Sequence, residues 1–271
     1  MPELPECETI VRGLQPLVGE TIQIVVTDAV KGLIKNISHE LFKSTLKDAS
    51  ILSIERSGKW IEFQLDNDFT LLSHLGMHGS WRLDPLELEP RHTRLAIYTE
   101  SHYLVYCDMR SWGRLMILDK RQAVEWLSRL GPDALLVEYE YLSEVLKRDK
   151  RSIVDILLDQ SVLSGIGNIY RSEILWLARI HPTRPGTDLV AREIRVISDC
   201  CRVVLRAAIL AQGSSLRDYV DVKGQPGKAQ FVHAAYSRKS LPCMRCGEST
   251  LILRGLAADG RKTFYCDNCQ L

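Results

Sequence analysis

The chain has 271 residues, of which 45% are hydrophobic and 25% charged, a composition typical of a globular protein with two modest domains. Because 35 basic residues stand against 34 acidic ones, the net charge of +1 gives no evidence for nucleic acid, and any anion-binding surface must be local. The N-terminal MPELPECETI has no signal-peptide character, and no later stretch is long enough to span a membrane. We therefore expect a cytoplasmic protein without a membrane partner. In that reducing compartment the eight cysteines are expected to bind metal or to lie buried, and not to form disulfides.

The first 132 residues are predicted to form one helix followed by short strands. Apolar residues recur at helical spacing over residues 7–18, behind Pro2 and Pro5, so a helix is expected almost at the terminus. Strand-like alternation follows, most clearly at residues 61–66, and continues to Leu118. A helix around residues 122–130 and the turn Gly131-Pro132 end this segment. We expect a β-sandwich domain over residues 1–132.

Beyond residue 133 the periodicity becomes helical. Helices are expected over residues 141–147, 153–160 and 193–212. The segment SVLSGIGNIYRSEIL predicts a helix, a two-glycine turn and a helix that begins at Asn168. From residue 213 to 239 no period is clear, so a mobile loop is expected there. The predicted fold class is α+β with two domains.

Two cysteine pairs dominate the C-terminal tail. Cys243-x-x-Cys246 is followed, after nineteen residues, by Cys266-x-x-Cys269, and four thiolates at such spacing suit a tetrahedral structural Zn²⁺. Two disulfides or free thiols are the alternative. Arg254, Arg261 and Lys262 lie between the pairs and suit phosphate contact, although a solvated basic face is as good an interpretation. The remaining cysteines stand on apolar patterns and are expected in cores: Cys7, Cys107, Cys200 and Cys201.

Two further segments carry candidate DNA-binding groups. The turn before Asn168 leaves backbone N–H groups at a helix start, where an anion is favoured, although Asn is also a common helix cap without a ligand. The HLGMHG stretch and residues 108–113 supply Met77, Arg110 and Trp112, a set able to wedge into a base stack. Taken singly, a Met or Trp in a β-rich domain is more often a core residue.

The amino terminus offers a nucleophile. A penultimate proline permits removal of Met1, which would expose Pro2 as a secondary amine with a pKa near roughly 8. A substantial fraction of such an amine is unprotonated at neutral pH, and Glu3 and Glu6 are close enough in sequence to exchange protons with it. The alternative is that PELPE merely leads into the helix.

In their order along the chain, these segments resemble the formamidopyrimidine-DNA glycosylase family, bifunctional base-excision enzymes that share a fold with endonuclease VIII. The matching stretches are PELPECETI, the SGK ending at Lys59, LLSHLGMHGS, residues 108–113, LLDQSVLSGIGNIYRSEIL, GSSLRDY, CMRC and GRKTFYCDNCQ. The resemblance covers the chain from its first residue to its last.

The resemblance implies four segments: a catalytic β-sandwich domain (1–132), a helix-two-turn-helix DNA-binding domain (133–223), a mobile loop on the lesion side (224–235) and a zinc finger (236–271), with DNA held between the halves. It also implies a mechanism. Pro2 attacks C1′ of the damaged nucleotide and forms a Schiff base, with Glu3 as the proton donor to the departing base and Glu6 as an auxiliary group. Lys59 serves in β-elimination and phosphate contact, and Arg261 grips phosphates and assists δ-elimination.

The resemblance further implies DNA contacts, in which Met77, Arg110 and Trp112 fill the gap left by a flipped base. The DNA-contact positions together are His74, Met77, His92, Arg110, Trp112, Lys150 within the cluster 147–151, and Asn168. Trp112 replaces the family's usual Phe. Two departures stand out: Ser111 replaces a common second arginine, and Val154 replaces a common lysine.

The leading hypothesis is a glycosylase and lyase that acts as a monomer, associated with the bacterial nucleoid, on oxidised purines such as 8-oxoguanine and formamidopyrimidines in duplex DNA. The LPE start favours this over an endonuclease VIII-like preference for oxidised pyrimidines, since that group usually begins PEGPE. Two alternatives are a damage-binding protein without catalysis and a zinc-ribbon transcription or replication factor. The joint presence of Pro2, Glu3, Lys59 and Arg261 argues against the damage-binding protein, and the zinc-ribbon factor leaves the N-terminus unexplained.

Overall fold

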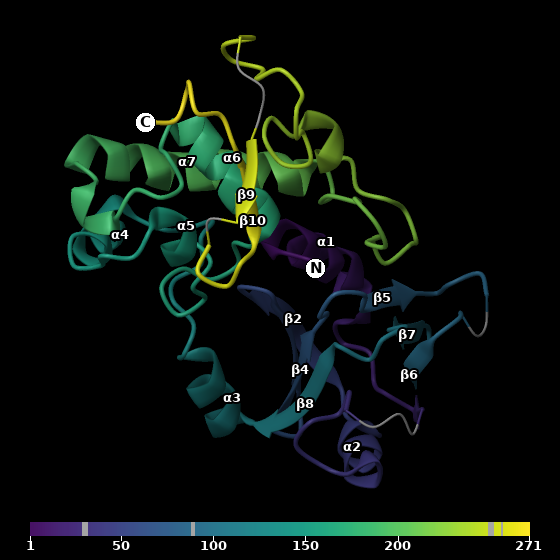
Figure 1. Cartoon of the computed structure of the whole chain (residues 1–271). Coiled ribbons are helices and arrows are strands. Elements are labelled where there is room, and N and C mark those ends of the chain that lie inside the picture. Colours follow the sequence, from purple (N-terminus) through teal and green to yellow (C-terminus); the bar gives the residue numbers. More distant parts are fainter. Residues whose placement is uncertain (29–31, 88–89, 249–251, 256) are drawn as a thin grey trace. The chain divides into compact units, whose positions relative to one another are not determined.

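The computed structural model describes residues 1–28, 32–87, 90–248, 252–255 and 257–271 (Figure 1). The chain divides into two compact units, Met1–Arg129 with Ala211–Lys228, and Leu130–Leu210 with Ala229–Leu271. The sequence-based division placed residues 211–223 with the helical segments, whereas by compactness they group with the N-terminal residues. The boundaries of independently folding domains stay a prediction.

Two four-stranded antiparallel sheets form the first unit. One sheet has the order β1 (Ile24–Thr27), β6 (Thr93–Tyr98), β7 (Tyr103–Cys107) and β5 (Ser80–Leu83). The other has the order β2 (Ile51–Ser57), β3 (Trp60–Leu65), β4 (Phe69–His74) and β8 (Arg114–Asp119). Side chains of both sheets share one core, where the rings of Phe63 and Trp81 lie 5.4 Å apart. This arrangement confirms the predicted β-sandwich.

Helix α1 (Leu4–Leu14) begins almost at the terminus, as predicted. A capping box joins Glu3 and Glu6, and Pro5 occupies the first turn, where its missing N–H costs nothing. The α-helix ends before Val18 because Pro16 cannot donate a backbone hydrogen bond, and a 3₁₀ turn, Gln15–Leu17, replaces its last turn. Helix α1 packs against β2, β3 and β5 (Figure 1).

Two further helices belong to the first unit. Helix α3 (Lys120–Leu127) corresponds to the helix predicted around residues 122–130. Helix α2 (His39–Leu46) was not predicted, because this region was assigned to strands. Its signals are local: Ser38 accepts a hydrogen bond from the backbone N–H of Leu41, and Phe42 and Leu46 bury one face.

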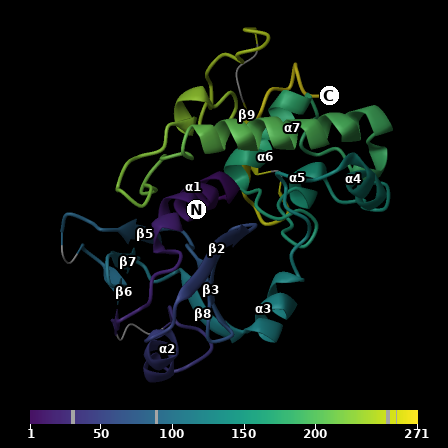
Figure 2. The ribbon, with the colours of Figure 1, turned by 180° about the vertical axis from the view of Figure 1, so that it is seen from behind.

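The second unit is helical with a small hairpin. Its helices are α4 (Tyr139–Leu146), α5 (Ile153–Ile156), α6 (Asn168–Ala178) and α7 (Ala191–Leu210), with 3₁₀ turns at Gly186–Asp188 and Ala229–Val232. Figure 2 shows α7 lying alongside α6. The apolar positions predicted for α7 are buried: Ile194, Ile197, Cys201, Leu205 and Ala208. Strands β9 (Ile252–Gly255) and β10 (Lys262–Tyr265) pair antiparallel.

Helix α5 is shorter than the predicted 153–160. The side chain of Asp159 accepts from the backbone N–H of Ser161 at 3.0 Å, and that of Gln160 donates to the Ile166 carbonyl at 2.9 Å. These side chains offer the backbone partners outside a helix, so the chain turns instead of continuing. The α+β class, with sandwich and helical parts, is as predicted. No helix in the described ranges is both long and apolar enough to cross a bilayer.

Candidate active site

The N-terminal residues are buried and tied down through Glu6. Glu3 and Glu6 are 2% and 1% exposed. The Glu6 carboxylate accepts the backbone N–H of Glu3 through Oε2 at 2.7 Å and that of Ser214 through Oε1 at 2.8 Å. Both oxygens therefore fix the start of α1, one locally and one through a distant segment of the same unit.

The terminal amine lies in a partly desolvated setting. Burial lowers the pKa of the Met1 amine, Glu3 and Glu6 oppose this shift, and Lys59 and Arg217 reinforce it. Desolvation disfavours the charged ammonium, so more of the amine is unprotonated at neutral pH. An amine with a depressed pKa beside carboxylates is equipped for nucleophilic attack with nearby proton acceptors and donors. Pro2 is itself buried next to this amine.

Lys59 stands in the turn between β2 and β3, next to Gly58, whose φ of 59° lies in the left-handed region. It is 6% exposed. Helix α1 contacts this turn, because the Cys7 thiol donates to the Lys59 carbonyl at 3.5 Å. The structure thus brings Lys59 within electrostatic range of the terminal amine, together with Glu3 and Glu6.

Residues 213–219 complete this site, and sequence reasoning singled out none of them individually. Gly213 has φ of 79°, and a Cβ there would lie 2.9 Å from the Glu6 carboxylate and 3.0 Å from the Tyr219 ring. Tyr219 donates to the Gln212 carbonyl at 3.2 Å, and burial raises the pKa of its hydroxyl. The motif GSSLRDY contained the signal, since only glycine permits both the backbone conformation and the close approach.

His74 supports the turn that carries Met77. Its Nδ1 accepts the backbone N–H of Gly76 at 3.1 Å, and its ring lies 5.0 Å from that of Trp60. Burial, reinforced by Lys59 and Arg114, lowers the pKa of His74 to about 4. The neutral imidazole is the form able to accept this bond. The Met77 side chain beyond it is 41% exposed, so it is not a core residue.

The loop 108–113 is organised by Asp108, which is 1% exposed. Its carboxylate accepts the backbone N–H of Arg110 at 3.1 Å and that of Gly113 at 2.7 Å. Ser111 adopts φ of 52°, in the left-handed region. The Arg110 guanidinium lies 5.1 Å from the centre of the Trp112 ring, and Trp112 is 54% exposed. An exposed cation and aromatic ring are therefore displayed by a fixed loop.

His92 and His78 join neighbouring segments of the same unit. His92 is exposed, has φ of 64°, and accepts the backbone N–H of Asp108 through its carbonyl at 3.0 Å. His78, next to Met77, pairs with Asp218 at 2.9 Å. The latter pair was not predicted from the sequence, because its members lie 140 positions apart.

In the second unit, Gln160 fixes the predicted glycine turn. Its side chain accepts the backbone N–H of Gly165, which has φ of 101°, at 2.9 Å and donates to Ile166. Asn168 then begins α6, half-buried, as expected. Its side-chain oxygen accepts from Arg171, a fully buried residue that sequence reasoning did not single out. Lys150 lies exposed in the turn after α4.

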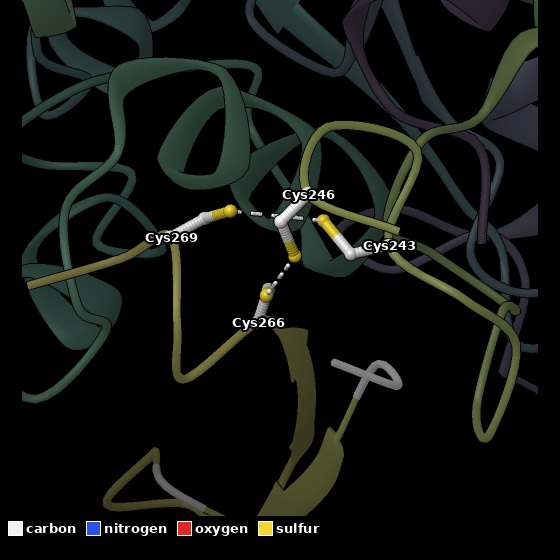
Figure 3. Close-up of side chains that lie close together, drawn as sticks. All are labelled: Cys243, Cys246, Cys266 and Cys269. Carbon is white, nitrogen blue, oxygen red and sulfur yellow. Dashed lines mark hydrogen bonds between the residues drawn. The ribbon is translucent and has the colours of Figure 1, made fainter. Parts of the chain in front are cut away.

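The four cysteines of the tail converge from two chain segments (Figure 3). All four Sγ atoms lie within 4.8 Å of one another and form a group able to hold a metal ion. The Sγ distances are 3.9 Å for both Cys243–Cys269 and Cys246–Cys266, too long for disulfides. Trp176 donates to Cys243 Sγ at 3.4 Å. Of the predicted core cysteines, Cys7, Cys200 and Cys201 are buried, while Cys107 is half-buried.

Arg261 directly precedes strand β10 of the hairpin, and its side chain is exposed. Its guanidinium pairs with Asp259 at 2.8 Å, and Asp259 also accepts the backbone N–H of Arg261 at 3.0 Å. The pair presents the guanidinium on the outside of the hairpin. Arg254 lies in β9, in a stretch whose side chains fall outside the described ones.

Two family models match the chain. The formamidopyrimidine-DNA glycosylase N-terminal domain matches residues 1–115, and the formamidopyrimidine-DNA glycosylase H2TH domain matches residues 130–220. A formamidopyrimidine-DNA glycosylase of Chloroflexus aurantiacus is 38% identical over 277 residues, which cover 100% of this chain and 98% of that protein. Another, from Ligilactobacillus salivarius, is 35% identical over 278 residues, covering 100% and 99% respectively.

Two solved structures have the same fold as this chain. The structure of Lactococcus lactis Fpg in complex with DNA containing an abasic site has a TM-score of 0.90 at 31% identity, covering 99% of each chain. The wild-type Lactococcus lactis Fpg in complex with DNA containing N7-benzyl-Fapy-dG gives a TM-score of 0.89, also at 31% identity and 99% coverage of each chain. The chain therefore belongs to the formamidopyrimidine-DNA glycosylase family.

Proposed function

We propose that this protein excises oxidised purines, formamidopyrimidines and 8-oxoguanine, from duplex DNA and then cleaves the strand at the resulting abasic site. The observation that carries the proposal is the N-terminal segment, in which Pro2, Glu3 and Glu6 are buried within electrostatic range of Lys59 and burial lowers the pKa of the Met1 amine. The relatives bear the name formamidopyrimidine-DNA glycosylase, and the Lactococcus lactis enzyme has been solved with Fapy-dG and abasic-site DNA. Base excision repair at the bacterial nucleoid, by a monomer in the cytoplasm, is the corresponding cellular role.

In the proposed mechanism Met1 is removed and the Pro2 nitrogen attacks C1′ of the damaged nucleotide. The bond from C1′ to the base breaks, and the departing base takes a proton, with Glu3 as its donor. Opening of the sugar ring converts the adduct to an iminium ion. That cation accepts the electrons released when a proton leaves C2′, so the C3′–O bond to phosphate breaks in β-elimination. One nucleophile thereby serves both base release and strand cleavage, and Glu6 holds Glu3 in place.

Lys59 and Arg261 have distinct proposed roles. Lys59 lies within electrostatic range of the amine, which suits proton removal during β-elimination and contact with a neighbouring phosphate. Arg261 is exposed and held by Asp259, which suits a grip on the phosphates of the lesion and assistance to δ-elimination. Both roles are proposals from residue chemistry and from the family resemblance.

The proposed DNA contacts fall into two groups. Met77, Arg110 and Trp112 would fill the gap left by the flipped base, since all three are exposed in the first unit. Phosphate contacts are proposed for His92, Lys150 and Asn168. His74 is proposed to act on DNA through the turn that carries Met77, because its own ring is engaged with Gly76 and Trp60.

The metal is proposed to be one structural Zn²⁺. A tetrahedron with Zn–S bonds of about 2.3 Å has edges of about 3.8 Å between sulfurs. The two Sγ distances of 3.9 Å fit such a tetrahedron, and four thiolates are a typical closed zinc site. The ion would hold the hairpin that carries Arg261, and it takes no part in the reaction. The finger is proposed to span residues 236–271, and the lesion-side loop residues 224–235.

Borohydride trapping tests the proposal directly. The mature protein, incubated with duplex DNA containing 8-oxoguanine and sodium borohydride, should give a covalent protein–DNA complex, and intact mass should show that Met1 is absent. Pro2→Gly replaces the secondary amine with a less nucleophilic and less constrained primary amine, and it should strongly slow trapping and strand cleavage. Pro16→Gly changes an exposed proline that lacks a terminal amine, so it should trap like the wild type.

Three outcomes would contradict the proposal in different ways. Tight binding to damaged DNA without any trapped species would indicate a damage-binding protein instead of an enzyme. Faster trapping with oxidised pyrimidines than with 8-oxoguanine would indicate the endonuclease VIII-like preference. A blocked terminus in the purified protein would exclude Pro2 as the nucleophile.

A further inference from the structure

Arg171 is a fully buried cation on α6, one turn from the helix start. Its exposed fraction is 0%. Withdrawing a guanidinium from water is costly unless hydrogen bonds hold it, so a buried arginine has a specific arrangement to maintain. Its Nη2 donates to the Asn168 side-chain oxygen, and its Nη1 donates to the Val154 carbonyl at 3.2 Å.

The first of these bonds orients the Asn168 amide. Because the Asn168 oxygen accepts from Arg171, the amide nitrogen is turned away and remains available as a donor only. Asn168 is half-buried at the first position of α6, where the helix dipole favours an anion. Arg171 also places a full positive charge behind this donor.

The second bond locates that charge beside residue 154. Val154 stands where the family resemblance predicts a lysine, and its side chain is fully buried. The Arg171 guanidinium, which reaches the residue 154 carbonyl from α6, provides a cation at this point of the fold.

We propose that Arg171 is a positioning residue for phosphate binding: it presents the Asn168 amide to a DNA phosphate and supplies the positive charge that residue 154 lacks. The proposal rests on the phosphate-binding role proposed above for Asn168. The ligand is a phosphodiester of the DNA backbone, so the contact carries no base preference.

The test is binding of the full-length protein to a duplex with a tetrahydrofuran abasic-site analogue, measured by fluorescence anisotropy over a range of salt concentrations. Arg171→Met should weaken binding about tenfold and reduce the slope of log K against log salt by at most about 1, the value for one neutralised phosphate, because the buried guanidinium acts without touching the DNA. Adding Val154→Lys to Arg171→Met should restore both the affinity and the slope. Arg206→Met, which removes an exposed arginine of α7, is the matched control and should change binding less than twofold.

A purely structural role would give a different pattern. Weaker binding by Arg171→Met with an unchanged salt slope and no rescue by Val154→Lys would overturn the proposal. Should Arg171→Met fail to fold, as judged by thermal unfolding, Arg171→Lys decides: it keeps the charge, so the salt slope must stay while the affinity falls.

Failure of this inference is separable from failure of the proposed function. Borohydride trapping at saturating DNA reports on the Pro2 chemistry and should survive in the Arg171 variants. Asn168→Ala tests the phosphate contact on which both proposals depend. Unchanged affinity and salt slope in that variant would show that Asn168 makes no such contact, and the proposed role of Arg171 would then have no basis.

Discussion

At the scale of single residues, the terminal amine determines how the reaction should depend on pH. Only the unprotonated amine attacks C1′, so trapping should rise with pH through the amine pKa. Burial lowers the pKa of the Met1 amine, and we expect the same direction for Pro2 once Met1 is removed. The rise should therefore lie below the ordinary range of an α-amine.

Arg217 offers a variant that shifts this profile without touching the proposed catalytic groups. Its positive charge lowers the pKa of the terminal amine, so Arg217→Met should move the midpoint of borohydride trapping to higher pH. Arg12→Met is the control, because Arg12 is an exposed arginine paired with Glu8. Single-turnover trapping rates measured between pH 5 and 9 give the pH midpoint for each variant. A midpoint that falls or stays fixed in Arg217→Met would contradict this electrostatic account.

His74 should make the stability of the first unit depend on pH. Its folded pKa of about 4 lies below the unfolded value of 6.5, so the unfolded chain binds its proton first. The contribution is complete above pH 6.5 and is lost as pH falls towards 4, by at most roughly 3 kcal/mol. His74→Asn retains an acceptor for the Gly76 N–H and cannot titrate. Urea unfolding at pH 7 and pH 5 should show a smaller pH effect in that variant than in the wild type.

At the scale of elements, the loop 108–113 depends on a tight contact between two glycines and a tyrosine. A Cβ on Gly113 would lie 1.9 Å from the Tyr106 hydroxyl oxygen, and one on Gly79 2.1 Å from it. Among the described residues, that buried hydroxyl has no hydrogen-bond partner. The packing of β7 thus leaves no room for any side chain at these two positions.

Gly113→Ala should therefore destabilise the protein by about 1–3 kcal/mol, the usual cost of overpacking. In a Tyr106→Phe background the cost should be smaller, because the atom that the new methyl group meets is gone. Urea unfolding of the two single variants and the double variant forms the cycle. Additive effects would mean that the methyl group is accommodated elsewhere.

Local patterns predicted most of the elements correctly. The apolar stripe of α7 depends on burial of one face, which the sequence records residue by residue. The alternation at residues 61–65 located β3, although Glu62 is buried there as well as Ile61 and Phe63. Helix α2 was missed although Ser38 caps it, because short β-like segments surround it. The end of α5 was misplaced because Gln160 bonds to residues further along the chain, which no period reveals.

At the scale of the whole molecule, we expect loss of the metal to leave the sandwich core folded. The cysteine cluster lies in the second unit, whereas the sandwich core lies in the first. Trp176 donates to Cys243 and packs against the cysteine cluster. Removal of the proposed zinc ion by a chelator under reducing conditions should change Trp176 fluorescence while leaving most sheet signal in circular dichroism. Trp176→Phe should lose the fluorescence change, and concerted loss of all sheet signal would contradict independent stability.

The candidate site could be predicted only where its members share a motif. Pro2, Glu3 and the four cysteines follow from local chemistry and spacing. The contacts of Ser214 and Tyr219 and the His78–Asp218 pair could not be predicted, because GSSLRDY marks the segment but the partners lie far away in the sequence. Arg171 was missed for another reason: a charged residue inside a helix is usually a solvated one, and its burial is visible only once α6 and α5 are placed.

The Glu6 carboxylate accepts the backbone N–H of Ser214, which lies 208 positions further along the chain, so this contact cannot form early in biosynthesis. The ribosome must extend the chain beyond Ser214 before the anchor of α1 can form, which at about 5–20 residues per second takes on the order of ten seconds or more. Throughout that interval the amino terminus is open to the aminopeptidase that trims methionine. The removal of Met1 that the proposed mechanism requires can therefore take place before the site is enclosed, and until Ser214 is in place the nascent polypeptide lacks this anchor of the proposed reactive centre.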